Sequence, residues 1–317
     1  MQRSPSAAPP HPVLVLLAFA AVWVIWGSTY LAIRVAIESL PGLLMAGVRF
    51  TAAGALLYAF GRLRGGARPT LAHWGSAALI GAMLLLVGNG CVVWAEHRIP
   101  SSLTALIVAT EPLWVVLIDW VRPGGARPAA VELVGCAVGF GGVAILIGPV
   151  EGGDGVATVL PAAIVLTLGS LSWATGSLYS RSAPMPASAP IATGMKMISG
   201  GVFLFLAGTI TGEWRPFDPA AITGRSVFAF FYLMVFGSLI AFSAYVFLLK
   251  VTTVARASTY AFVNPVVAVA LGCAIGGEPL GWRTIAATVV IVGAVALITS
   301  VEKGTKALAP DCEEAAA

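Results

Sequence analysis

Charged residues are scarce in this chain of 317 residues. Asp, Glu, Lys and Arg together make up 10% of it, whereas hydrophobic residues make up 58%. A soluble domain carries about 25% charged residues, because its surface must face water. So few charges cannot cover the surface of a globule. The composition excludes an ordinary soluble protein and predicts a surface that faces lipid.

Residues for enzyme and metal chemistry are also rare. The histidines are His11, His73 and His97, and none has metal-ligand spacing to another. Three of the 4 cysteines lie inside apolar runs, so no disulfide framework is predicted. No glycine-rich phosphate loop precedes a Lys-Ser or Lys-Thr pair, which argues against ATP-driven transport. We therefore expect no enzyme activity, no metal and no cofactor.

Long apolar runs dominate what is present. A transmembrane helix needs about 20 mostly apolar residues, and short breaks rich in Pro, Gly and charge separate such runs along the whole chain. The polar ends, 1–12 and 302–317, are expected to be disordered cytoplasmic tails. The sequence predicts an all-α integral membrane protein with ten spans, at 13–37, 42–61, 72–94, 101–121, 130–148, 158–180, 190–211, 225–249, 256–276 and 281–301.

Basic residues fall mainly on one side of these spans. Cytoplasmic loops are enriched in Lys and Arg, and this places both termini inside (N-in, C-in). The external loop of Glu151 and Asp154 has no basic residue. The excess of basic residues, a net charge of +4, is therefore explained by membrane topology, and no nucleic-acid partner is expected. Five of the basic residues assigned to the inside are Arg62, Arg64, Arg68, Arg122 and Arg127.

The chain contains two related halves. WGSTY begins at Trp26 and WATGSLY begins at Trp173, and the same offset superposes Arg49 on Lys196. Later, TEPLWVVL in the first half matches VNPVVAVA in the second, after the offset changes by six residues. Several ordered matches indicate an internal repeat.

Each half holds five predicted spans, which is an odd number. The second repeat, 158–301, must then enter the membrane from the opposite face to the first, 13–148. Inverted repeats with a binding site at their interface are typical of secondary transporters. A duplication kept only for stability is the alternative.

Glu111 is the outstanding polar residue at membrane depth. An ionisable side chain there costs roughly 2.5–3.5 kcal/mol on insertion scales. It is predicted either to carry a proton or pair with a cationic substrate group, or to be neutralised by Arg49 or Lys196 and merely tie helices together. Both interpretations stay open. Asn89 and Glu96 are weaker candidates.

Arg49 and Lys196 could bind anionic substrate groups, close a gate, or extend to the membrane surface along their aliphatic stems. A structural role is favoured for both. Pro112 and Pro265 each remove a backbone donor in mid-span, which predicts kinks that act as hinges. Asn264 could bind a ligand, but an interhelical hydrogen bond worth about 0.6 kcal/mol is favoured.

Aromatic residues are plentiful. Trp26, Tyr30 and Tyr179 are predicted to lie deep and at matched positions, where they could form a pocket wall for amphipathic or aromatic solutes. Small-xxx-small steps, Gly135 with Gly139 and Gly272 with Gly276, are compatible with a homodimer or with close packing inside the bundle. Packing inside the bundle is favoured.

With these features in view, the sequence resembles the EamA-type permeases of the drug/metabolite transporter superfamily, in particular their bacterial YedA-type members. The resemblance covers nearly the whole chain apart from its two ends. The motifs that carry it are IWGSTY, AGVRF, VGNG, AEH, YAFVNPVVAVALG and GGEPL.

The resemblance implies a bacterial inner-membrane exporter of small metabolites or drugs that works by alternating access, as a uniporter or coupled to protons. A membrane scaffold or receptor-like protein without flux is the alternative, and a channel is less favoured because one chain supplies too few pore-lining polar groups. The resemblance also implies a central cavity that would include Trp26, Tyr30, Asn89, Glu111, Tyr179, Tyr245 and Asn264.

Overall fold

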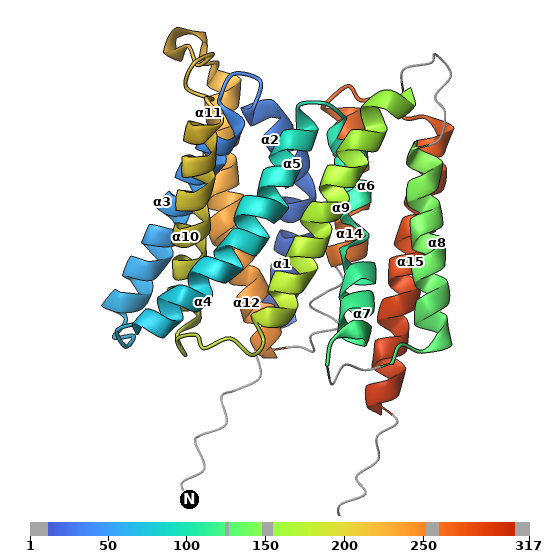
Figure 1. The fold of residues 1–317 in the computed structure, drawn as a ribbon, viewed down its shortest axis with the longest axis horizontal. Helices are drawn as coiled ribbons and strands as arrows, with labels where there is room; N and C mark the ends of the chain where they lie inside the picture. Colours follow the sequence, from blue (N-terminus) through green and yellow to red (C-terminus); the bar gives the residue numbers. More distant parts are fainter. Residues whose placement is uncertain (1–11, 124–126, 148–154, 252–259, 308–317) are drawn as a thin grey trace, which may run out of the picture.

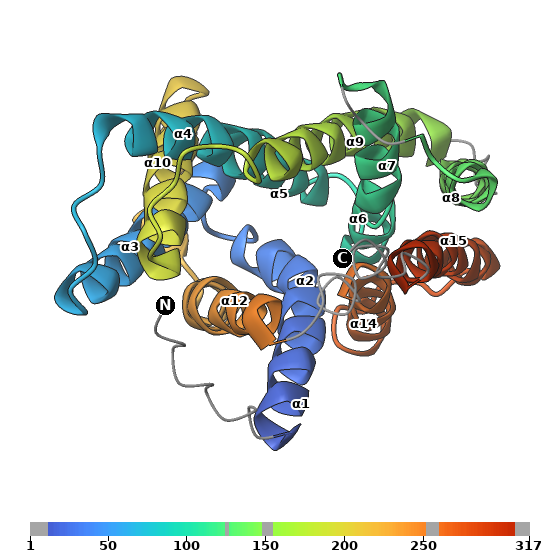
Figure 2. The same cartoon turned by 90° about the horizontal axis from the view of Figure 1, so that it is seen from below.

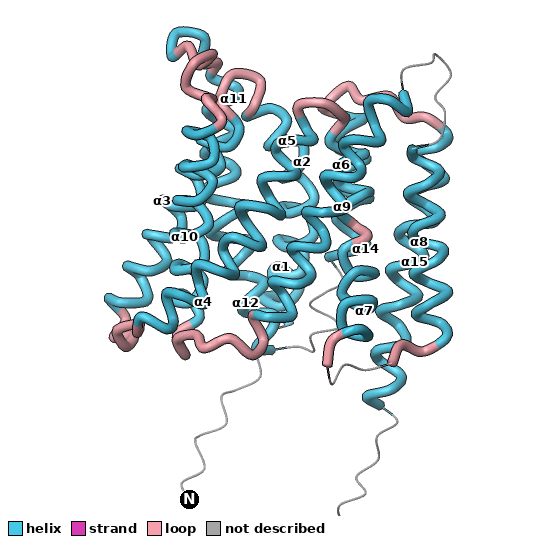
Figure 3. The backbone as a smooth tube through the Cα atoms, viewed as in Figure 1, coloured by secondary structure: helices cyan, strands magenta, loops and turns pink. Residues whose placement is uncertain are grey.

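The computed structural model describes residues 12–123, 127–147, 155–251 and 260–307. Within these ranges the chain is built of helices joined by short turns, and it contains no strand (Figure 3). Residues 1–11 and 308–317, which belong to the expected tails, lie outside the described residues. The last helix continues through Ala307, beyond the expected boundary at 301.

In its described residues, the first half contains eight α-helices and two π-helices (Figure 1). In chain order they are α1 (Pro12–Ala20), η1 (Ala21–Ile25, π), α2 (Trp26–Ala36), α3 (Gly42–Leu63), α4 (Leu71–Gly81), η2 (Ala82–Asn89, π), α5 (Gly90–Glu96), α6 (Ser101–Val108), α7 (Glu111–Val121) and α8 (Ala130–Ile147).

The second half follows the same plan, with a short 3₁₀ turn before its third span. Its elements are α9 (Gly155–Tyr179), α10 (Ala189–Ile210), η3 (Pro219–Ala221, 3₁₀), α11 (Gly224–Tyr232), η4 (Leu233–Ile240, π), α12 (Ala241–Val251), α14 (Tyr260–Ala274) and α15 (Trp282–Ala307).

Seven helical segments of the described residues are long and apolar enough to cross a membrane. They are Pro12–Ala36, Gly42–Leu63, Leu71–Glu96, Ser101–Val121, Val159–Tyr179, Ala189–Ile210 and Gly224–Tyr245. Three shorter apolar helices occupy the other expected spans, namely Ala130–Leu146, Val263–Ala274 and Trp282–Ile298. The all-helical, multi-pass class predicted from the sequence is confirmed, and the count of ten spans stays a prediction.

The ends of α3 and α10 show how closely the two halves repeat each other. Gly65 follows α3 and Gly212 follows α10, each with a φ of +80°. In both places the next residue donates its amide to a carbonyl five residues earlier, as in a Schellman C-cap. The offset from Gly65 to Gly212 is also the offset from Trp26 to Trp173. We call these pairs equivalent positions.

Equivalent helices α3 and α10 pack backbone against backbone. A Cβ added to Gly54 would lie 2.7 Å from the carbonyl oxygen of Gly194, and one added to Gly194 would lie 2.7 Å from that of Gly54. Earlier in α3, Gly47 faces Phe205, which comes later in α10. The contacts move backwards along α10 as the chain advances along α3, so the two helices are antiparallel.

Equivalent helices α8 and α15 are antiparallel too, and Figure 2 shows them as a pair at one side of the molecule. Gly135 contacts Ile298, whereas Gly142, further along α8, contacts Ile291. Gly139 between them faces Leu113 of α7, so these glycines serve packing within the chain. Antiparallel pairing of equivalent helices is the geometry that an inverted repeat requires.

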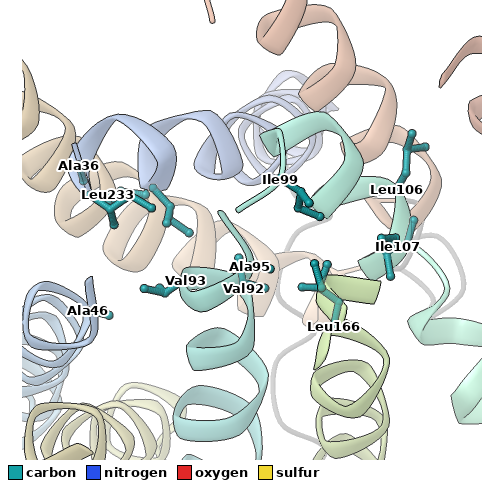
Figure 4. Close-up of a cluster of buried hydrophobic side chains, with 14 of the residues drawn as sticks. Ala36, Ala46, Val92, Val93, Ala95, Ile99, Leu106, Ile107, Leu166 and Leu233 are labelled. Carbon is teal, nitrogen blue, oxygen red and sulfur yellow. The ribbon is translucent and has the colours of Figure 1, made fainter. Parts of the chain in front are cut away.

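One large apolar core joins the two halves (Figure 4). It combines side chains of α2, α3, α5 and α6 with side chains of α9 and η4. Ile99, Leu166 and Leu233 are three of its buried members. Because this core crosses the boundary between the halves, the two halves pack against each other through it.

Candidate functional site

An aromatic cluster stands where the two halves meet. Trp26 at the start of α2 has its ring centroid 5.3 Å from that of Tyr245 in α12 and 5.0 Å from that of Tyr260 in α14. The rings of Tyr245 and Tyr260 are edge to face at 5.6 Å, and Phe242 completes the group. Such tilted contacts fix the ring positions. We call these four residues the aromatic cluster.

Trp26 also binds a π-helix of the other half. Its indole Nε1 donates to the carbonyl oxygen of Gly237 in η4 at 3.2 Å. Trp173, the equivalent tryptophan of α9, lies against Gly88 in η2, where an added Cβ would come within 2.8 Å of its ring. Both halves thus set a tryptophan on a glycine of a π-helix. π-helical segments occur frequently at functional sites, and Trp173 was not among the predicted site residues.

Glu111 lies at a break in the fourth span. α6 ends at Val108 and α7 begins at Glu111, so the carboxylate stands at a helix N-terminus inside an apolar segment. The N-terminal end of a helix favours negative charge, because its amide dipoles point their positive ends there. Thr110 at the break donates its hydroxyl to the carbonyl of Ile107 at 2.7 Å. This placement puts a polar group at a helix break in the middle of the apolar span.

The groups that interact electrostatically with Glu111 come from both halves. They are Tyr30 of the first half and Tyr245, Tyr260 and Arg181 of the second. Among the described residues, the cation that acts on the Glu111 carboxylate is Arg181, just beyond the end of α9, and neither Arg49 nor Lys196 takes the neutralising role expected for it. The aromatic cluster and Glu111 belong to one site.

The two prolines behave differently. Pro112 lies in the first turn of α7, directly after the break, where a missing amide hydrogen costs nothing. Pro265 lies inside the continuous helix α14. The structure therefore interrupts the fourth span as predicted for Pro112 and leaves the ninth helical at Pro265. A hinge role for either proline stays a prediction.

Two asparagines were predicted for the site, Asn89 in the first half of the chain and Asn264 in the second. The Asn264 amide, in the orientation that satisfies its neighbours, donates to the carbonyls of Trp23 at 3.1 Å and Tyr260 at 3.3 Å. This is the interhelical bond favoured from the sequence, and it ties α14 to η1. Asn89 ends η2, and its buried Oδ1 has no hydrogen-bond partner among the described residues. Asn89 is thus the freer of the two for a ligand.

Tyr30 lies in α2 within electrostatic range of Glu111, as expected for a site residue. Tyr179 does not lie deep: it is the last residue of α9 and is 37% exposed. The offset that pairs the two tryptophans aligns Tyr30 with Ser177, so the predicted match of Tyr30 with Tyr179 is wrong by two positions.

Arg49 and Lys196 are not part of this group. Arg49 is only 5% exposed and stacks its guanidinium over Phe50 at 4.0 Å, so it does not extend to the membrane surface. Its Nε and Nη1 have no hydrogen-bond partner among the described residues, and the Glu96 carboxylate acts on it electrostatically. Lys196 is partly buried in α10.

Glu96 is more deeply buried than its ranking as a weak candidate suggested. It is fully buried at the end of α5, and neither carboxylate oxygen has a hydrogen-bond partner among the described residues. Arg34 binds the backbone carbonyls of Glu96 and Ile99 instead. Arg34, Arg49 and Glu278 all act on the Glu96 carboxylate electrostatically. Its position at the outer end of the third expected span and the AEH motif were the sequence signals for this residue.

A model of one known protein family matches each of the two halves of the chain separately. The model of the "EamA-like transporter family" matches residues 13–148 and again residues 160–300. The chain belongs to the EamA-like transporter family.

Relatives extend this family membership over most of the chain. The "Uncharacterized inner membrane transporter YedA" of Escherichia coli (strain K12) is 44% identical over 284 residues, covering 89% of both chains. The "Uncharacterized transporter YvbV" of Bacillus subtilis (strain 168) is 25% identical over 305 residues, covering 96% of both. A "Probable amino-acid metabolite efflux pump" of Escherichia coli (strain K12) is 27% identical over 180 residues, covering 53% of this chain and 52% of the pump.

A solved structure named "Crystal structure of protein" supports the fold. It has a TM-score of 0.62 and 21% identity, and the match covers 93% of this chain and 99% of that one. This EamA-family member is thus a multi-pass protein of the inner membrane.

Proposed function

We propose that this EamA-family member is a secondary transporter that exports small organic metabolites or drugs across the inner membrane by alternating access. The observation that carries the proposal is the broken fourth span. It places Glu111 at a helix N-terminus, within electrostatic range of Tyr30, Tyr245 and Tyr260 from both halves. Broken helices at the interface of inverted repeats are where secondary transporters bind substrates.

The architecture supports the same function. The repeats span 13–148 and 158–301, and we propose ten spans with both termini in the cytoplasm, as the distribution of basic residues indicates. Antiparallel equivalent helices allow one half to rock against the other around a fixed site. Substrate would then meet each face of the membrane in turn.

The site suits an organic solute with an apolar or aromatic part and a polar group. The aromatic cluster offers ring edges and faces, and Glu111 offers a carboxylate that can bind a cationic group or exchange a proton. The name of the amino-acid metabolite efflux pump among the relatives is compatible with such a solute. No nucleotide-binding loop is present in the sequence, so a solute or proton gradient would supply the energy.

Flux into liposomes tests this function. Purified protein would be reconstituted and challenged with a panel of amino acids and toxic amphiphiles, with and without a pH gradient. We expect specific flux that is lost in Glu111→Gln, because the amide cannot carry a charge or release a proton. Proton coupling predicts that the pH gradient changes the flux of the native protein.

A matched control lies on the same helix. Asp119 forms an ion pair with Arg122 at 2.6 Å, one turn apart and away from the site. Asp119→Asn makes the same chemical change as Glu111→Gln, and its flux should stay near the native level. A scaffold or receptor-like protein would show no solute-dependent flux in any variant. Native flux in Glu111→Gln would remove Glu111 from the mechanism.

A further inference from the structure

Two carboxylates of the second half bind helix N-termini of the first half. Glu213, after α10, accepts the amides of Leu43 and Leu44 at the start of α3, both at 3.0 Å. Glu278, in the turn between α14 and α15, binds the start of α6. It accepts the amide and hydroxyl of Ser101 at 2.7 Å each and the amide of Ser102 at 3.0 Å. Both contacts lie at the upper end of the molecule in Figure 1.

These helices lack caps of their own. The first amides of a helix have no intrahelical acceptor, and a side chain at the N-cap position commonly accepts from them. Here the N-cap residues are Pro41 and Pro100, and neither makes a side-chain cap. The acceptor comes instead from the opposite half, as a full negative charge at the positive end of the helix dipole. Separation of the halves at this end would leave both helix starts uncapped.

The equivalent positions at the other end of the molecule cannot make this bond. Glu213 corresponds to Gly66, and Leu44 corresponds to Ile191 at the start of α10. Gly66 contacts Ile191, so the two positions face each other as Glu213 and Leu44 do. Gly66 has no carboxylate, however, and Pro190 before Ile191 has no amide hydrogen to donate. For this pair of equivalent positions, a cap between the halves therefore forms at one end of the molecule and not at the other.

Further polar contacts join the halves at the capped end. Ser226 of α11 donates its hydroxyl to the carbonyl of Val35 at 2.8 Å, and Arg225 pairs with Glu38 at 3.8 Å. Several polar contacts at the opposite end are local instead. Thr70 caps α4 by binding the amide of His73, and the other local contacts are Glu132 with Ala129 and Arg122 with Asp119.

We propose that Glu213 and Glu278 form a two-point latch that closes this end of the transporter and sets its resting conformation. Passage of solute through the latch end requires both carboxylates to leave the starts of α3 and α6. The protein at rest is then closed at the latch end, and solute enters from the opposite end. This proposal rests on alternating access, but its test needs no substrate.

Distances between spin labels measure the latch directly. In a variant with Cys91, Cys136, Cys273 and Cys312 replaced, one label pair is placed at the latch end, on Arg98 and Leu280. A second pair is placed at the opposite end, on Leu71 and Ala187. We expect Glu213→Gln/Glu278→Gln to lengthen the first distance and shorten the second. Loss of a helix cap changes an equilibrium by about fivefold, so the closed-to-open ratio should fall by about that factor per carboxylate.

Glu132→Gln is the matched control, because Glu132 caps a helix within its own half. It should leave both distances unchanged. Ser101→Ala removes one hydrogen bond and no charge, and it should shift the distances in the same direction by less, which keeps the test available if the double variant does not fold. Unchanged distances in the double variant, with a lower melting temperature, would show that the caps only stabilise the fold and would overturn the latch. Absence of flux for every solute would instead count against transport.

Discussion

Glu278 accepts three hydrogen bonds from the start of α6, whereas Glu96 is fully buried with neither carboxylate oxygen bonded among the described residues. The two carboxylates act on each other electrostatically, and Arg34 acts on Glu96 as well. Burial raises the pKa of Glu278, but the hydrogen bonds from Ser101 and Ser102 outweigh it and hold that pKa below its ordinary value. The hydrogen bonds of the latch therefore stabilise the charged form of Glu278.

The pH dependence of the latch follows from this lowered pKa. Stabilisation by a carboxylate with a lowered pKa is present above its ordinary value, about 4.3 for Glu, and is lost as the pH falls through the lowered value. We expect native protein to melt at a higher temperature than Glu278→Gln by a constant margin from pH 8 to pH 5, and the margin to shrink in stronger acid. The groups that face Glu278 are Arg34, Glu38, Arg225 and Glu96.

Thermal melting at several pH values checks this. A margin that has already vanished at pH 6 would mean that Glu278 is not held as a charged cap. Glu132→Gln again serves as the control, since its carboxylate caps a helix inside one half.

At the scale of single residues, the sequence predicted Glu111 because an ionisable group inside an apolar run has a cost that is visible without coordinates. It could not predict that Arg181 is the described cation acting on Glu111, because the packing of α7 against α9 brings the two together. Tyr179 was misplaced because the terminal tyrosines of WGSTY and WATGSLY were matched by residue type, although the two motifs differ in length. A strict offset from the tryptophans places Ser177, and not Tyr179, opposite Tyr30.

At the scale of helices, the seam between α3 and α10 depends on glycines. A Cβ added to Gly54 would meet the backbone of α10, 2.7 Å from the oxygen of Gly194 and 2.8 Å from the nitrogen of Ile198. Backbone atoms cannot rotate away as a flexible side chain can. We expect Gly54→Ala to destabilise the protein by about 1–3 kcal/mol, as overpacking does. The melting temperature in detergent measures this.

Gly141 in α8 provides the control for that substitution. An added Cβ there meets nothing within 4 Å, and alanine favours a helix over glycine by about 0.8–1.0 kcal/mol. Gly141→Ala should keep or raise the melting temperature. Equal losses in both variants would mean that glycine is needed for reasons other than the seam.

Helix interruptions were only partly predictable. Two prolines in matched motifs predicted two kinks, and the structure breaks the chain only before Pro112. Pro112 falls in the first turn of a new helix, where its missing amide is not needed. At Pro265 the helix continues, and the Asn264 amide binds the neighbouring carbonyls of Trp23 and Tyr260. The π-helices η2 and η4 had no sequence signal beyond the VGNG motif.

At the scale of the whole molecule, we propose that ten spans place both termini on the cytoplasmic face. Reporter fusions at the two ends, or labelling of single cysteines by a membrane-impermeant reagent in intact cells, would test this arrangement. We expect single cysteines introduced at positions 71 and 187 to be protected from the reagent in cells. Single cysteines introduced at positions 98 and 280 should react, because the latch end faces outwards in this topology. Reaction of a cysteine at position 71 in intact cells would contradict the orientation with both termini in the cytoplasm.

The repeat also explains why so much of the architecture was predictable. An odd number of spans per half requires inversion, and the antiparallel pairs α3 with α10 and α8 with α15 follow from it. The sequence could not show which end of the molecule is held shut. That difference depends on Glu213 reaching Leu43, two residues 170 positions apart in the chain, and no local pattern reports such a contact.

The mismatch of Glu213 with Gly66 has a thermodynamic consequence. If the two halves were identical, a two-fold axis in the membrane plane would convert the state open to one face into the state open to the other, and the two states would have equal energy. Any preference of such a carrier for one face must therefore come from equivalent positions that hold unlike residues. Exchange of residues between such pairs offers a way to tilt that balance without touching the binding site.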